Sequence, residues 1–197
     1  MTRKNQYKTA LLCAVTLFFA GCNKQDNTRP NYQEAINNYY KAHPLCIWQD
    51  TKKLPVQAAT SDDAKTEGFD ALTDAGLLTR TTAEKKVLIV ASKQVNNYDL
   101  SVQGRSAWTP DTTQPGYGNF CYGHRAVDSI DSVSNGVNGS GLKTADVNYH
   151  YSMADVPGWA QSEEVKTAFP SLAAALAQSQ LAHDSLVMNG SNWQVAK

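Results

Sequence analysis

Cysteine and histidine side chains are the residues of this chain best suited to chemistry, and two pairs of them share one spacing. Two residues separate His43 from Cys46, and Cys121 and His124 repeat that spacing in the opposite order. Two sulfur and two nitrogen ligands form a tetrahedral zinc set, so these four side chains could hold zinc if the fold brought both segments together. Pro44 stiffens the first segment, which counts against such a site.

The other candidates for acid–base chemistry lack the motifs that accompany catalysis. The chain contains no Gly-x-Ser-x-Gly and no His-Glu-x-x-His sequence. His150 falls on the polar face of an expected strand, where a solvent-facing histidine is the simpler interpretation. Carboxylates lie close together at Asp62 and Asp63, at Asp128 and Asp131, and at Glu163 and Glu164. Acids at helix starts complement the helix dipole, so we expect no catalytic residue and no cofactor.

Residues 104–122 combine aromatic side chains and a cation with glycine and proline, and we predict a long loop over 104–118. Loops on a rigid scaffold concentrate recognition residues, and aromatic and arginine side chains dominate interfaces. The candidate binding residues are Arg105, Trp108, Tyr117, Phe120 and Tyr122. The alternative is that Trp108 and Phe120 fill the hydrophobic core beside Cys121.

Three to four helices are predicted by apolar spacing and capping residues. Residues 31–42 form the first, with a tyrosine-rich face that we assign to the core rather than to a ligand: Tyr32, Ile36, Tyr39 and Tyr40. The second starts after a cap at residues 61–63, buries Phe69, Leu72 and Ala75, and ends at Gly76. Ser162 caps a third, short helix, and Pro170 begins a fourth that runs to residue 182.

Alternating and β-branched segments predict an antiparallel sheet of about four to six strands. The expected strands are 86–91 paired with 98–102 across a turn at 94–97, then 119–133, 146–153, 183–188 and 193–196. In 146–153 the inward residues are Val147, Tyr149 and Tyr151. With the helices, these strands indicate one α+β domain over residues 31–197.

The N-terminus has the layout of an export signal. Arg3, Lys4 and Lys8 precede an uncharged segment, residues 10–20, which is too short to span a bilayer permanently. The sequence Phe19-Ala20-Gly21-Cys22 resembles the lipobox of bacterial lipoproteins. The resemblance implies removal of residues 1–21, lipid attachment at Cys22 and stable membrane anchoring through acyl chains. A secretory signal with a chance cysteine is the alternative.

Export would decide the fate of the cysteines. Cys13 would leave with the signal and Cys22 would carry lipid, so Cys46 and Cys121 would remain as one pair in an oxidising compartment. We therefore expect a disulfide and no metal, with zinc ligation or two free buried thiols as alternatives. Closing a loop of this size contributes about 4 kcal/mol in the chain-entropy model.

Charge and anchor together indicate an envelope protein. After removal of residues 1–21, 15 basic residues face 18 acidic ones, so binding to nucleic acid is disfavoured. Residues 22–30 form an acylated N-terminus and a polar tether that holds the domain near its membrane. By analogy with enterobacterial sorting, Asn23 favours the outer membrane. The expected function is non-enzymatic binding of an envelope protein or glycan; the alternative is a hydrolase with a non-local catalytic site.

Residues 69–91 are similar to the helix-then-wing part of a winged-helix module. The likeness depends on Leu72 and on Ala75-Gly76-Leu77-Leu78 before the expected strand. The DNA role of such modules is not implied here, because the segment has no basic recognition face and an exported protein would not meet DNA.

Overall fold

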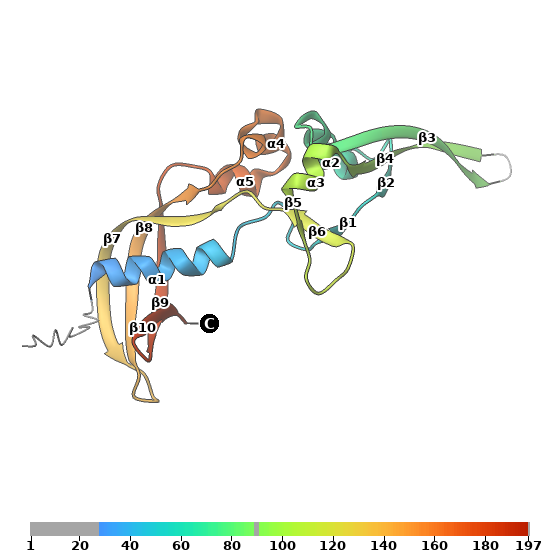
Figure 1. The fold of residues 1–197 in the computed structure, drawn as a ribbon. Helices are drawn as coiled ribbons and strands as arrows, with labels where there is room; N and C mark the ends of the chain where they lie inside the picture. Colours follow the sequence, from blue (N-terminus) through green and yellow to red (C-terminus); the bar gives the residue numbers. More distant parts are fainter. Residues whose placement is uncertain (1–27, 89–90, 197) are drawn as a thin grey trace, which may run out of the picture.

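The structure, a computed structural model, describes residues 28–88 and 91–196. Figure 1 shows two lobes, one built on α1 and β7–β10 and the other carrying a long hairpin, β3 and β4, at its far end. The predicted signal, the lipobox, Cys22 and most of the predicted tether lie outside the described residues. Within the described part, no helix has the length and apolar character needed to cross a membrane.

One helix and four antiparallel strands make the first lobe. They are α1 (Arg29–Ala42), β7 (His124–Val137), β8 (Lys143–Ala154), β9 (Gln180–Asn189) and β10 (Asn192–Val195). The strand order β10-β9-β8-β7 makes β7 and β10 the outer strands. The sheet curves around α1, which packs against both outer strands. Gly190, with φ of 60°, occupies the β9–β10 turn, where a type II′ turn requires a positive φ.

The core of the first lobe lies between α1 and the inner face of this sheet. Tyr32 and Ile36 of α1 are fully buried there. From β8 come Val147, Tyr149 and Tyr151, while the residues between them face away from the core, so the predicted alternation is confirmed. Met153, near the end of β8, packs against this core and against that of the second lobe.

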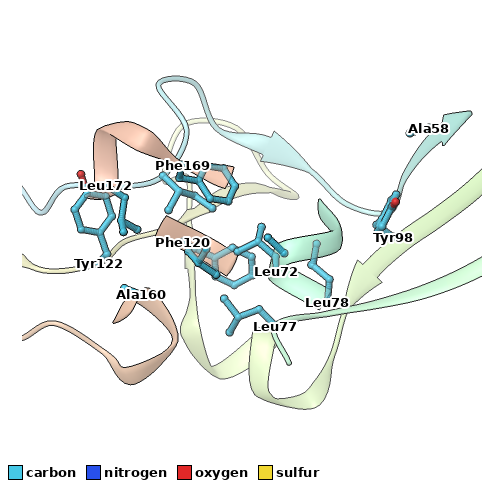
Figure 2. Close-up of a cluster of buried hydrophobic side chains, with 13 residues drawn as sticks. Ala58, Leu72, Leu77, Leu78, Tyr98, Phe120, Tyr122, Ala160, Phe169 and Leu172 are labelled. Atoms are coloured by element: carbon cyan, nitrogen blue, oxygen red, sulfur yellow. The ribbon is translucent and has the colours of Figure 1, made fainter. Parts of the chain in front are cut away.

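The remaining described elements make the second lobe. They are β1 (Lys52–Lys53), β2 (Val56–Ala59), α2 (Asp63–Asp74), β3 (Leu78–Leu88), β4 (Ala91–Leu100), α3 (Val102–Ala107), β5 (Trp108–Pro110), β6 (Tyr117–Phe120), η1 (Gly158–Gln161), α4 (Glu163–Ala168) and α5 (Pro170–Ala175). Two sheets form, in the orders β1-β6-β5 and β2-β4-β3. Phe120 packs with Leu72 and Leu77, and Phe169 and Leu172 contribute to the same cluster (Figure 2). The predicted α+β class with antiparallel sheets is confirmed.

The predicted disulfide between Cys46 and Cys121 is present at the junction of the lobes. The two residues form a β-bridge, and next to it the backbone N–H of Tyr122 donates to the carbonyl of Leu45 at 2.8 Å. Their Cα atoms are 3.8 Å apart although 75 positions separate them in sequence. Both sulfur atoms are consumed, so the zinc and free-thiol alternatives are wrong.

The helix predictions are confirmed except at the last one. α1, α2 and α4 lie where expected, Gly76 has φ of 78°, and the Ser162 hydroxyl accepts a hydrogen bond from the Val165 N–H at 3.3 Å. The helix predicted to reach residue 182 ends at Ala175. The side-chain amide of Gln180 donates to the carbonyls of Ala174 and Ala175, and the chain then pairs with β8 as β9.

The hairpin prediction has the wrong turn. β3 and β4 pair from Leu78 with Leu100 to Leu88 with Ala91, with an irregularity between Lys86 and Leu88, so residues 94–97 lie inside a strand rather than in a turn. Of the segment 86–91, expected to be a buried strand, Lys86 belongs to β3 and is exposed. β-branched composition favours a strand but does not specify what covers it.

The long loop predicted over residues 104–118 is also wrong. The Ser101 hydroxyl accepts from the Gly104 N–H at 2.8 Å and starts α3, and β5 then pairs with β6. Asp111 organises the turn between these strands, because its carboxylate accepts hydrogen bonds from the N–H and the hydroxyl of Thr113 and from the hydroxyl of Thr51. These bonds lower the pKa of Asp111 to about 2.

Candidate functional site

Helix α1 presents three different faces to the sheet that surrounds it. Tyr32 and Ile36 are buried in the core, one helical turn apart. A second face, with the polar residues Arg29, Gln33 and Asn37, reaches β7. A third face, with Glu34 and Asn38, turns toward β10. The spacing of four residues within each face follows from the helical repeat.

The β7 side is closed by hydrogen bonds. The backbone N–H of Val127 donates to the side-chain oxygen of Asn37 at 2.8 Å, and its carbonyl accepts from the side-chain amide of Gln33 at 3.0 Å. The guanidinium of Arg29 donates to the carbonyl of Ile130 at 2.7 Å. An outer strand otherwise exposes such groups as a template for another strand, so α1 blocks this edge at Val127 and Ile130.

The β10 side leaves an open groove of about 500 Å³. We call it the α1–β10 groove and define it by its lining residues: Asn31, Glu34, Ala35, Asn38, Tyr39, Asn192, Trp193, Gln194 and Val195. Four of them carry side-chain amides, of which those of Asn38 and Gln194 matter most because Asn31 and Asn192 already have interaction partners, and Glu34 carries a full charge. Amides both donate and accept hydrogen bonds, so the groove is furnished for polar recognition.

The backbone of β10 adds further hydrogen-bonding groups to the groove. Asn192 pairs with Asn189 across the two-residue turn, and the N–H of Ala196 donates to the carbonyl of Ser185 at 2.8 Å. In an antiparallel ladder, alternate residues bond to the partner strand, so Trp193 and Val195 direct their N–H and C=O groups away from β9. In the described part of the chain, no hydrogen bond satisfies these outward groups.

Trp193 fixes the position of the groove wall. Its ring meets that of Tyr32 edge-on, with 5.0 Å between centroids, and the residue is only 6% exposed. The indole Nε1 is buried and has no hydrogen-bond partner among the described residues. A strand anchored in this way keeps its outer edge at a constant distance from α1.

A half-buried polar network holds the other end of α1. The hydroxyls of Tyr40 and Tyr149 donate to the two carboxylate oxygens of Asp184, at 3.1 and 2.6 Å. Burial, and then the Asp184 carboxylate, raise the pKa of Tyr149 far above its ordinary value. The guanidinium of Arg125 lies between the rings of Tyr40 and Tyr151, 5.0 and 4.7 Å from their centroids. Such a network rigidifies the helix that forms one wall of the groove.

The five binding residues predicted from sequence do not share one surface. Phe120 and Tyr122 are buried, and Trp108 packs edge-on against Phe120 at 5.0 Å. Arg105 is exposed and donates to the carbonyl of Leu100 at 2.8 Å. Tyr117 lies in β6, with the Lys53 ammonium 6.0 Å from its ring centroid. A binding role for the exposed members stays a prediction, whereas Trp108 and Phe120 follow the core alternative.

The histidines are dispersed and each approaches at most one carboxylate. His150 lies 2.8 Å from Asp131, His124 lies 3.6 Å from Asp155, and the third pair, His183 and Asp146, is 3.8 Å apart. His43 stacks on Tyr39. In residues 28–88 and 91–196, no serine or cysteine side chain hydrogen-bonds to a histidine, and no group of three potential metal ligands gathers.

A second hollow, of about 540 Å³, lies where β8 meets η1, α4 and α5. Met153, Val156 and Leu176 supply apolar walls. Its cation, Lys166, is 2.6 Å from the Glu163 carboxylate, so its charge is already balanced. The α1–β10 groove is the stronger candidate because it combines an open strand edge with an unbalanced charge.

Sequence reasoning missed the groove because its residues are ordinary polar residues far apart in the chain. It assigned the tyrosine face of α1 to the core, which is right for Tyr32 and wrong for Tyr39, a groove residue. The sequence feature that could have revealed the groove was the set of polar residues on the helix face opposite Gln33. Comparison of the chain with protein-family models, curated proteins and solved structures finds no match.

Proposed function

We propose that this chain is a lipid-anchored envelope protein that binds a partner macromolecule in the α1–β10 groove without transforming it. The observation that carries this proposal is the contrast between the outer strands. Val127 of β7 bonds to α1 through both backbone groups, whereas Trp193 and Val195 of β10 keep theirs unbonded beside an open groove. Edge strands of soluble proteins are normally covered or blunted, so an open one beside a polar groove favours binding.

The envelope location is supported by the N-terminal sequence. Basic residues, an uncharged segment and Phe19-Ala20-Gly21-Cys22 together have the layout of a lipoprotein signal. Asn23 after the cysteine favours the outer membrane over the inner one. A disulfide in the mature part fits an oxidising compartment. The anchor would keep the groove close to the membrane, because only a short tether separates Cys22 from α1.

The groove chemistry favours binding over the alternative of hydrolysis. Acid–base hydrolysis of a glycosidic bond requires two carboxyl groups facing each other across the cleft. Among the residues that the structure describes, Glu34 is the only carboxylate that lines the groove, and no histidine accompanies it. Side-chain amides, which make up much of the lining, recognise polar groups but do not exchange protons at neutral pH.

Photo-crosslinking in intact cells tests the binding site. A photoreactive amino acid at Asn38, an exposed groove residue, should form a defined adduct with an envelope component. The same amino acid at Val102, which is 79% exposed in the second lobe, is the matched control. Equal adduct patterns at both positions would show that the groove has no special role.

The anchor is tested separately. We expect Cys22→Ser to abolish acylation and to move the protein from the membrane fraction to the soluble fraction. Acyl incorporation and fractionation that do not change in this variant would contradict lipid anchoring. The groove proposal would survive that result, because an exported protein without a lipid anchor could still meet an envelope partner and form the crosslink.

A further inference from the structure

We infer that the partner bound by the α1–β10 groove is an extended polypeptide segment with a basic side chain, which adds to the sheet as a strand beside β10. This inference rests on the proposed binding function and specifies its ligand. Three properties of the groove support it: the pattern of free backbone groups, the burial of its tryptophan and the sign of its charge.

The free backbone groups of β10 have the repeat of an extended peptide. Trp193 and Val195 both direct N–H and C=O outward, and residues two apart in a strand are separated by about 7 Å. A peptide strand presents its own donors and acceptors at the same interval, so it would match these outward groups with four main-chain hydrogen bonds. Strand addition to an open edge is a common mode of peptide recognition.

A glycan fits this surface less well than a peptide. Sugar rings stack on exposed aromatic faces, but Trp193 is 6% exposed and its ring is covered by Tyr32. Tyr39 is already stacked on His43, with 4.3 Å between ring centroids. The main-chain groups of β10 are therefore the most accessible recognition elements that the groove offers.

The charge of the groove selects the peptide. Glu34 lies on the exposed face of α1, and in the described residues no cation pairs with it. The strand β10 forms one wall of the groove and α1 forms the other. The side chains of an added strand that point toward α1 would therefore lie near Glu34. A lysine or arginine there would form an ion pair, whereas an acid would be repelled.

The test measures binding of two synthetic peptide pools to the purified chain. Both consist of eight-residue peptides of alternating threonine and valine with blocked ends, and one position carries lysine in the first pool and glutamate in the second. We expect the lysine pool to bind about tenfold more tightly or better. The variant Glu34→Gln should remove this preference and leave the fold unchanged, because Glu34 is exposed.

A matched pair of variants tests the backbone contact. Val195→Pro removes the outward N–H but no bond to β9, and proline is tolerated where an edge-strand N–H faces solvent. Val195→Ala loses the side chain and keeps the N–H. We expect the proline variant to weaken binding of the lysine pool about tenfold, with the alanine variant close to wild type. Thermal unfolding checks that both variants are folded.

Each other outcome overturns the inference. Failure of both pools to bind, or equal binding by a folded Val195→Pro variant, removes strand addition. Binding of a tetramer of β-1,4-linked N-acetylglucosamine instead of peptides would assign the groove to glycan and leave the proposed function intact. Tighter binding of the peptide NKQDNTRP, residues 23–30, would assign it to the chain's own tether. A dimer seen by sedimentation and lost in Val195→Pro would assign it to a second copy.

Discussion

Helix α1 contacts the two outer strands of one sheet in different ways. At β7, Arg29, Gln33 and Asn37 bond to backbone groups that would otherwise be free. At β10, the same helix packs beside the strand but leaves a groove of about 500 Å³ along one flank. Both strands belong to the same fold and have the same neighbour, so the difference arises from the side chains on the two flanks of α1. A few side chains of the neighbouring helix therefore decide whether the outward backbone groups of an edge strand are bonded or left exposed.

The shared core beneath both edges gives the largest expected effect. Ile36 is fully buried between the two flanks, so Ile36→Ala should lower the free energy of unfolding by about 3 kcal/mol. Ala35→Ser, one residue away on the groove flank, should change it by less than about 0.5 kcal/mol. Denaturant unfolding measures both values. Similar losses in the two variants would mean that α1 does not have distinct faces.

Neighbouring asparagines on α1 provide the sharpest test of the comparison. Asn37→Ala leaves the N–H of Val127 without an acceptor and should cost about 1–3 kcal/mol. Asn38→Ala, on the groove flank, should have an effect within about 0.5 kcal/mol. The difference in unfolding free energy between these variants is the measurement. If Asn38→Ala proved as costly as Asn37→Ala, the β10 side would also be closed by the helix.

The hydroxyl network that fixes α1 predicts a loss of stability in alkali. The pKa of Tyr149 is raised on folding, so its contribution is complete below the unfolded pKa of about 10 and declines as pH rises above that value. Tyr149→Phe removes a hydrogen bond to a carboxylate and should cost about 1–2 kcal/mol at neutral pH. It should also flatten the decline between pH 10 and pH 11. Unfolding curves at several pH values would show an unchanged slope if Tyr149 were uninvolved.

Amide hydrogen exchange should distinguish the two edges without any mutation. The N–H of Val127 bonds to Asn37 and should be protected, whereas the N–H groups of Trp193 and Val195 should exchange at least about tenfold faster than that of Gln194, which bonds to β9. Exchange followed by NMR resolves each residue. Equal protection along β10 would indicate that its outer edge is covered in solution.

The elements that were predictable from sequence are those whose signals are local. The spacing of Tyr32 and Ile36, the positive φ required at Gly76 and the alternation through Tyr149 depend on residues within one helix or strand. The disulfide was predictable because export would leave one pair of cysteines. Each of these predictions needed no knowledge of how distant segments pack.

The errors and omissions arose where long-range packing decides the outcome. Composition favoured a hairpin turn at residues 94–97, but the β3–β4 register places these residues inside a strand, and Lys86 of the expected buried strand is exposed. Phe120 and Tyr122 were predicted to be binding residues because their segment has the composition of a binding loop, but both are buried. The α1–β10 groove joins residues near 35 to residues near 194, and its decisive feature, an unbonded strand edge, is a property of topology rather than of side chains.

The disulfide between Cys46 and Cys121 has a consequence for proteolytic cleavage of the backbone. At 3.8 Å the crosslink joins points as near as consecutive residues of a chain. Because the disulfide joins Cys46 to Cys121, a protease that nicks the polypeptide anywhere between Ile47 and Phe120 would leave both fragments covalently attached. Such a nicked molecule would migrate as a single species on a non-reducing gel and separate into two only after reduction.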